Sequence, residues 1–248
     1  MASSSPTTDA DVFATATPLA SAPAKARHDQ KVVLVSLEAR RQSNAHFFDV
    51  GWLQSHGVDE VLSFRQLDGM PSTAISYANF ELRHALRPPL PVEHKIAAVA
   101  AFVTNCDDNT PTRRTHVLRA LNATGVPVYS FGKCMQTHDI ATVFPECASQ
   151  SRRSALWDFK KLCVAQHFLF MLSFENSDAP GYVTEKLYQP LLAGSVPIYG
   201  GTADVRHLLP SENAAIVLDR FDDASIRDMS STVKNAMRIK SAYNAMLR

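Results

Sequence analysis

The apolar residues of this 248-residue chain fall into short runs separated by polar turns. Residues 168–174, FLFMLSF, have the length and aromatic content of a buried strand. A polar turn follows at 175–178, and Thr184, whose hydroxyl suits an N-cap, opens a predicted helix. Gly194 ends this helix, and another strand begins at 196–199. The pattern predicts a strand–loop–helix–strand unit whose polar residues gather at the carboxyl end of the first strand.

Strand-like and helix-like segments also alternate along the rest of the chain. Strands are expected at 32–37, 61–64, 96–103, 126–131 and 216–218, and helices at 112–121, 156–164 and 226–246. Residues 1–29, rich in Ala, Ser, Thr and Pro, are expected to be a disordered tail. Strand–helix alternation with short connections predicts an α/β fold with a parallel sheet and helices on both faces.

Composition and charge exclude several classes of function. The chain is 46% hydrophobic and 20% charged, as is usual for a soluble globular protein. Its net charge of +1 offers no electrostatic basis for binding nucleic acid or an anionic membrane surface. No stretch approaches about 18 uncharged apolar residues, and the N-terminal segment lacks the apolar core of a signal peptide.

The four cysteines are too few for a disulfide scaffold and lack the CxxC spacing of a zinc site. Buried thiols are the default interpretation for Cys106, Cys134, Cys147 and Cys163. Cys106 and Cys134 each follow a predicted strand, so their sulfurs can meet if those strands are neighbours in a parallel sheet. Such a bridge would suit an oxidising lumen.

The end of the strand at 168–174 is the strongest candidate for a binding site, because open α/β sheets bind ligands beyond the carboxyl ends of their strands. The helix that follows offers free backbone N–H groups, and Lys186 adds a full charge, so an anionic ligand is favoured. The alternative is that Glu175, Glu185 and Lys186 are ordinary solvated loop and helix residues. Glu175 ends the strand in an apolar setting, where a carboxylate must be hydrogen-bonded and can hold the loop.

Three polar motifs in this region resemble a known family. FENS at 174–177, YVTEKL at 182–187 and AGSVPIY at 193–199 resemble the signature of the α-1,3/1,4-fucosyltransferases, the GT10-type enzymes that use GDP-fucose. The resemblance implies a GT-B fold, in which two Rossmann-like halves face each other across a cleft. It disfavours a GT-B transferase that uses a different nucleotide sugar.

The resemblance also implies a division of the chain. Residues 95–248 correspond to the GDP-fucose-binding Rossmann-like domain, and residues 30–94 to only part of the acceptor-side domain, so the N-terminal half is expected to be incomplete. Family members begin with a cytoplasmic tail, a membrane anchor and a stem, which are not recognisable here. A fragment, a truncated gene model and a reduced family member all remain open. The implied location is the Golgi membrane, with a lumenal catalytic domain and attachment only through an anchor absent from this chain.

The implied reaction moves L-fucose from GDP-fucose to a hydroxyl of a glycan or glycoprotein acceptor. The expected product is α-1,3-linked on an N-acetylglucosamine-containing acceptor and forms with inversion. The donor diphosphate needs positive charge, and the family match assigns this role to Lys186 and Arg114, the latter selected over Arg113 by counting back from Leu118 and Leu121.

Asn176, Tyr182 and Glu185 match family positions that contact the nucleotide sugar. Tyr182 can pack against an apolar ring face, and Glu185 can accept hydrogen bonds from ribose or fucose hydroxyls. The alternatives are a tyrosine that anchors the loop and a first-turn carboxylate of the helix.

Inverting transfer needs a base on the acceptor side. Glu38 directly follows the predicted strand at 32–37 and matches the family's base glutamate, although Ala39 and Arg40 replace the residues that usually follow it. A catalytically inactive relative that retains nucleotide-sugar binding is therefore the alternative to an active enzyme. An exposed surface glutamate is the alternative for Glu38 itself.

No metal or cofactor is expected to be required. Asp107-Asp108 and Asp222-Asp223 lack the DxD spacing of metal-dependent glycosyltransferases. Lysine and arginine at the diphosphate would remove the need for a bridging metal.

Overall fold

The computed structural model describes residues 10–14, 28–39, 45–78, 88–148 and 159–247. The chain divides into two compact units, Met1–Ser76 and Tyr77–Arg248, and each is described by itself. The sequence analysis instead placed the boundary between the partial domain and the donor domain at residues 94 and 95.

The first unit is a four-stranded parallel sheet in the order β1-β2-β3-β4. Its elements are β1 (Ala10–Ala14), β2 (Lys31–Ser36), η1 (Ala45–Phe48), α1 (Val50–Ser55), β3 (Glu60–Ser63) and β4 (Ser72–Ala74). The Asp49 carboxylate caps α1 by accepting a hydrogen bond from the Trp52 N–H at 2.9 Å. Leu53 of α1 packs with Leu34 and Val61 of the sheet in the core of this unit.

Strand β1 corrects the prediction of a disordered tail over residues 1–29. Ala10–Ala14 pairs in parallel with β2, in the register Ala10↔Lys31 to Ala14↔Val35. The edge of β2 would otherwise present unpaired N–H and C=O groups, which are a template for a further strand. Composition alone could not show this pairing, because the partner is distant in the sequence.

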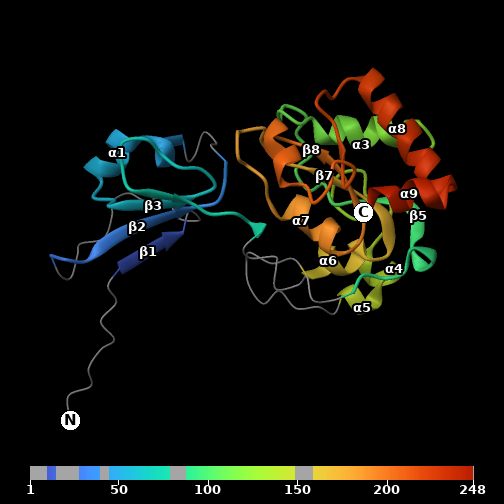
Figure 1. Cartoon of the computed structure of the whole chain (residues 1–248), viewed down its shortest axis with the longest axis horizontal. Helices are drawn as coiled ribbons and strands as arrows, with labels where there is room; N and C mark the ends of the chain where they lie inside the picture. The colour runs from blue at the N-terminus through green and yellow to red at the C-terminus, as the bar shows by residue number, and fades with distance from the viewer. Residues whose placement is uncertain (1–9, 15–27, 40–44, 79–87, 149–158, 248) are drawn as a thin grey trace, which may run out of the picture. The chain divides into compact units, whose positions relative to one another are not determined.

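The second unit is a five-stranded parallel sheet in the order β6-β5-β7-β8-β9 (Figure 1). The strands are β5 (Ile96–Ala101), β6 (Val128–Ser130), β7 (Phe168–Phe174), β8 (Val196–Gly200) and β9 (Ile216–Val217). The helices are η3 (Val92–His94), α3 (Arg114–Ala123), α4 (Ile140–Val143), α5 (Pro145–Ala148), α6 (Phe159–Ala165), α7 (Glu185–Leu192), η4 (Ala203–Leu208), α8 (Asp223–Arg238) and α9 (Lys240–Met246).

Helices cover both faces of this sheet. On one face, Val117 of α3 and Ile226 of α8 pack in the main core with Phe170 of β7. On the other, Val164 of α6 packs with Phe168 of β7 in a second cluster. All seven residues of β7 are buried, which explains their uniformly apolar sequence. The predicted α/β architecture with a parallel sheet is confirmed.

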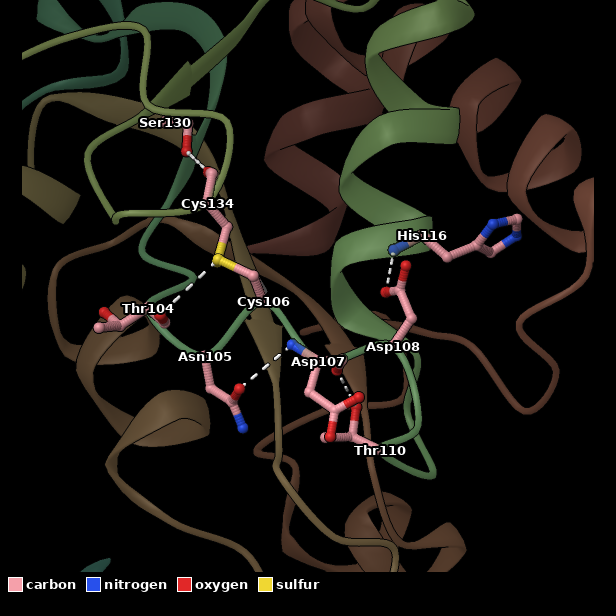
Figure 2. Close-up of a disulfide and its surroundings, with 9 residues drawn as sticks. All are labelled: Thr104, Asn105, Cys106, Asp107, Asp108, Thr110, His116, Ser130 and Cys134. Carbon is pink, nitrogen blue, oxygen red and sulfur yellow. Dashed lines mark hydrogen bonds between the residues drawn. A yellow bond between two sulfur atoms is a disulfide. The ribbon is translucent and has the colours of Figure 1, made fainter.

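All four cysteines of the chain form disulfides within this unit. Cys106 and Cys134 are bonded beyond the ends of the neighbouring strands β5 and β6, as their positions in the sequence indicated (Figure 2). Cys147 and Cys163 are also bonded and connect α5 to α6. The default interpretation of four buried thiols is therefore wrong for both pairs, and only the first pair was open to prediction from strand ends.

Candidate functional site

The junction between β7 and α7 is built around Glu175, which directly follows the strand and is fully buried. Its Oε1 accepts hydrogen bonds from the backbone N–H of Thr184 at 2.8 Å and from the Thr184 hydroxyl at 3.0 Å. Its carbonyl oxygen accepts a 2.6 Å hydrogen bond from the Thr112 hydroxyl, at the neighbouring β5–α3 junction. Glu175 thus holds the loop closed, and it ties together the two junctions that face the same sheet edge.

Lys186, in the first turn of α7, is surrounded by acceptors. Its Nζ lies 3.1 Å from Glu185 Oε1 and 3.5 Å from Glu175 Oε2, and it donates to the Thr184 hydroxyl at 3.0 Å. About a quarter of the side chain, 26%, remains exposed. The ammonium is thus held at the helix start and is still reachable from solvent.

The pKa values of the two carboxyl groups beside Lys186 are shifted in opposite directions. Burial raises the pKa of Glu175, and the nearby Lys186 ammonium only partly opposes this effect. Burial also acts to raise the pKa of Glu185, but the charges of Lys186 and Lys161 outweigh it, so the pKa of Glu185 lies below its usual value. With its pKa below the usual value, Glu185 is ionised at neutral pH.

The second junction presents Arg114, the first residue of α3. Asp108 accepts a 2.7 Å hydrogen bond from the His116 N–H (Figure 2). Asp107 accepts one from the Asn109 N–H at 2.9 Å. The Asp107-Asp108 pair therefore organises the loop and the start of the helix. Arg114 is 9% exposed.

Arg114 and Lys186 line one small cavity near the carboxyl ends of β5 and β7. The lining residues are Phe102, Val103, Arg114, Lys161, Met171, Leu172, Phe174, Lys186 and Gln189. The structure thus brings together the two cations that the sequence analysis assigned to a phosphate site. A third cation, Lys161 of α6, was missed because the predicted helix at 156–164 gave no indication of which of its faces meets α7.

The three other predicted donor-binding residues lie in the loop between β7 and α7 or in the first turn of α7. Asn176 follows Glu175 in the loop and is partly exposed. Tyr182 is 1% exposed, and its backbone N–H donates to the Ala179 carbonyl at 3.0 Å. Glu185 contacts Lys186 as described above. The burial of Tyr182 agrees with a residue that packs inside the loop.

Glu38 lies two residues beyond the end of β2, in the first unit, and its side chain is partly exposed.

A second, wider groove lies between α3 and α8. Its lining residues are His116, Arg119, Ala120, Ala123, Thr124, Asp223, Ile226, Arg227, Ser230, Ser231 and Lys234. Here the Lys234 ammonium donates to the Thr124 carbonyl, and Arg119 lies 3.7 Å from Asp108. These cations join elements of the fold, and His116 near the start of α3 lies 3.4 Å from Asp223, the first residue of α8.

Among the described residues, one group of potential metal ligands lies close together, namely Cys147, Cys163 and His167. Its two sulfurs are joined in a disulfide and cannot serve as thiolate ligands. Within the described ranges, no helix is both long and apolar enough to cross a membrane.

Comparison with known proteins shows the family of the chain. Residues 92–248 match the family described as Glycosyltransferase family 10 (fucosyltransferase) C-term. The chain is 34% identical over 123 residues to the Alpha-(1,4)-fucosyltransferase of Arabidopsis thaliana, covering 48% of this chain and 30% of that protein. It is 28% identical over 195 residues to the GDP-fucose protein O-fucosyltransferase 3 of Gallus gallus, covering 76% of this chain and 39% of that protein. The chain therefore spans well under half the length of these curated relatives.

The fold is similar to that of an alpha1,3-fucosyltransferase solved with GDP, with a TM-score of 0.56 and 18% sequence identity over 88% of this chain and 65% of that chain. The structure of an alpha1,3-fucosyltransferase with GDP-fucose gives the same TM-score at 19% identity, over 89% of this chain and 66% of that chain. At such low identity the likeness speaks for the fold, and it confirms the predicted GT-B-type α/β class.

Proposed function

Because the chain belongs to glycosyltransferase family 10, the fucosyltransferases, we propose that it binds GDP-fucose at the joined β5–α3 and β7–α7 junctions and transfers fucose to an acceptor hydroxyl. One observation carries the proposal: Arg114 and Lys186, from two separate junctions, line the same cavity. Two cations beside two helix starts suit a diphosphate, since backbone N–H groups and side-chain charges act on the same anion.

The neighbouring polar residues suit the sugar parts of the donor. Glu185, whose pKa lies below its usual value because Lys186 and Lys161 outweigh the effect of burial, supplies a carboxylate acceptor for ribose or fucose hydroxyls. Asn176 offers an amide from the loop between the two elements. Tyr182, being buried, shapes this loop from within and limits where the sugar can lie.

In the proposed reaction, the acceptor hydroxyl attacks the anomeric carbon of fucose from the face opposite the leaving GDP. The new glycosidic C–O bond forms as the bond to the diphosphate oxygen breaks, which inverts the configuration. The Glu38 carboxylate takes the acceptor proton, and Arg114 and Lys186 stabilise the charge that develops on GDP. We propose that these cations take the place of a bridging metal.

Two classes of acceptor are considered for the transferred fucose, a glycan hydroxyl and a protein hydroxyl. The resemblance of the FENS, YVTEKL and AGSVPIY motifs to the α-1,3/1,4-fucosyltransferases favours an α-1,3 link to an N-acetylglucosamine-containing glycan, whereas the relative from Gallus gallus is named as a protein O-fucosyltransferase. The family membership supports the glycan acceptor as the first candidate and a protein hydroxyl as the second. A Golgi lumenal location is proposed with it, supported by the two disulfides, which persist in oxidising compartments.

Transfer of labelled fucose from GDP-fucose tests the proposal, with an N-acetylglucosamine-terminated oligosaccharide and a folded unglycosylated protein as parallel acceptors. We expect label in the oligosaccharide, retained in EDTA, and linkage analysis of the product then determines the α-1,3 assignment. Label in the protein alone would select the second acceptor class. GDP binding without any transfer would favour an inactive relative, and loss of transfer in EDTA would contradict the metal-independent mechanism.

A further inference from the structure

Metal-binding side chains converge where α5 and α6 lie side by side (Figure 1). Cys147, Cys163 and His167 each offer one ligand atom, and these atoms all lie within 4.8 Å of one another. None of the three lines the small cavity of the proposed donor site. We propose that this cluster is a zinc site that forms when the disulfide between Cys147 and Cys163 is reduced. The proposal does not depend on the donor that the cavity binds.

The ligand types and their separations suit zinc. Two thiolates and an imidazole form a ligand set that selects Zn²⁺. With Zn–S bonds of about 2.3 Å and Zn–N bonds of about 2.0–2.1 Å, a sulfur and a nitrogen of one tetrahedral site lie about 3.6 Å apart. Cys147 Sγ lies 4.0 Å from His167 Nε2. The Glu146 carboxylate, with Oε1 3.4 Å from the same nitrogen, is placed to take the fourth position.

The fold already holds the histidine in place. The His167 ring stacks on Phe144, with the ring centroids 4.5 Å apart. The backbone N–H of His167 donates to the Val164 carbonyl at 3.0 Å, and its carbonyl accepts a 2.7 Å hydrogen bond from the Ile96 N–H. Its side chain keeps some exposure to solvent, as does Cys163. The ligands are therefore preorganised, and a reductant and a metal ion can both reach them.

The exchange of the disulfide for the metal balances in two steps. A dithiol reductant attacks the disulfide through its thiolate, and its second thiol resolves the mixed disulfide. Two electrons pass to the cysteine sulfurs, the reductant closes to its own disulfide, and its two protons end on Cys147 and Cys163. Zn²⁺ then binds both sulfurs and His167 Nε2 and releases the two thiol protons. Rotation about the Cα–Cβ bonds separates the sulfurs, because the Cα atoms are 5.5 Å apart.

Either form of the cluster cross-links the same two helices. The disulfide joins α5 to α6 in an oxidising compartment, where such bonds persist. In a reducing compartment the zinc ion replaces it, through ligands on α5 and at the carboxyl end of α6. Helix α6 also contributes Lys161 to the lining of the small cavity, so this cross-link holds an element of the proposed donor site in either redox state.

Anaerobic titration with Co²⁺, followed by displacement with Zn²⁺, tests the proposal on the full chain after reduction and removal of the reductant. Tetrahedral cobalt–thiolate complexes absorb visible light, so the spectrum reports the ligand set. We expect one metal ion per chain in the reduced wild type and none at this site in the oxidised protein. The double variant Cys106→Ser with Cys134→Ser should still bind it, since Cys147 and Cys163 are then the only cysteines left.

Variants of the ligands separate this site from loose binding by free thiols. Cys147→Ser with Cys163→Ser should abolish the cobalt spectrum. His167→Gln should weaken binding at least ten-fold, because losing a ligand costs no less than losing one of its outer partners. The matched control is His138→Gln, which removes a histidine that likewise stacks on an aromatic ring, that of Tyr129, and which should bind as wild type does.

Circular dichroism follows the fold of each sample. If the reduced chain unfolds without metal, recovery of the native spectrum on adding Zn²⁺, in wild type and not in His167→Gln, would support the site. Equal metal binding by the oxidised protein, by the variant without Cys147 and Cys163, or by His167→Gln and its control would overturn the proposal.

Discussion

Replacing Lys186 with methionine is expected to weaken GDP binding and also to destabilise the protein, for two different reasons. The ammonium lies 3.5 Å from the fully buried Glu175 carboxylate. At an effective dielectric constant of about 20, the gross attraction at such a distance is about 5 kcal/mol, and most of it offsets the desolvation of the two ions. Methionine keeps the apolar stem and removes only the charge.

We expect Lys186→Met to lower the free energy of unfolding by about 2–3 kcal/mol, at or below the lower limit of the roughly 3–5 kcal/mol that breaking a buried ion pair costs. The loss is limited because burial already raises the pKa of Glu175, so the carboxyl group can take up a proton when its partner is removed. GDP affinity is expected to fall separately by about ten- to a hundred-fold, since a charge-assisted contact to phosphate is lost.

The double variant Lys186→Met with Glu175→Gln separates the two effects. Glutamine can still accept the hydrogen bonds of Thr184 but carries no charge, so the double variant should regain most of the stability that the single variant loses. It should not regain GDP affinity. Urea unfolding and GDP calorimetry on the same samples measure both quantities. A single variant with wild-type GDP affinity would refute the phosphate role, and a double variant as unstable as the single one would refute the ion-pair reasoning.

Three further predictions concern other parts of the chain. Glu38→Gln should lower the rate of fucose transfer by about 10²- to 10⁴-fold while leaving GDP affinity unchanged. Single-turnover kinetics measures this rate, and a rate near wild type would contradict the assignment of Glu38 as the base. Replacing Cys106 and Cys134 with serine opens a loop with a sequence separation of 28, and urea unfolding should show a loss of roughly 3–4 kcal/mol. Burial lowers the pKa of Lys95 to about 8 from its ordinary value of 10.5, so the unfolded chain binds more protons between these values. The free energy of unfolding of wild type should therefore rise, relative to Lys95→Met, as the pH increases from about 8 toward 10.5, and a constant difference would contradict it.

The β7–α7 unit shows how much of the site was predictable from local sequence. Residues 168–174 form β7 with the bounds that their apolar run indicated, and Thr184 caps α7 as its hydroxyl and position suggested. Both features depend on residues close together in the chain. Burial of every position on β7 produces an uninterrupted apolar run, which is an unambiguous local signal.

Features that depend on tertiary neighbours were harder to predict. The disulfide between Cys147 and Cys163 requires α5 and α6 to lie together, and no strand-end rule indicates that arrangement. Lys161 enters the cavity only because α6 packs beside α7, whereas its neighbour Lys160 has the same local sequence context. Helical periodicity describes the faces of a helix, but it does not say which face meets a ligand.

The central claim, that the joined β5–α3 and β7–α7 junctions bind the donor nucleotide, is tested most directly by a crystal structure of the chain with GDP. We predict that the diphosphate lies in the small cavity, within hydrogen-bond distance of Arg114 and Lys186. GDP bound elsewhere, for example in the groove between α3 and α8, with this cavity left without nucleotide, would contradict the account.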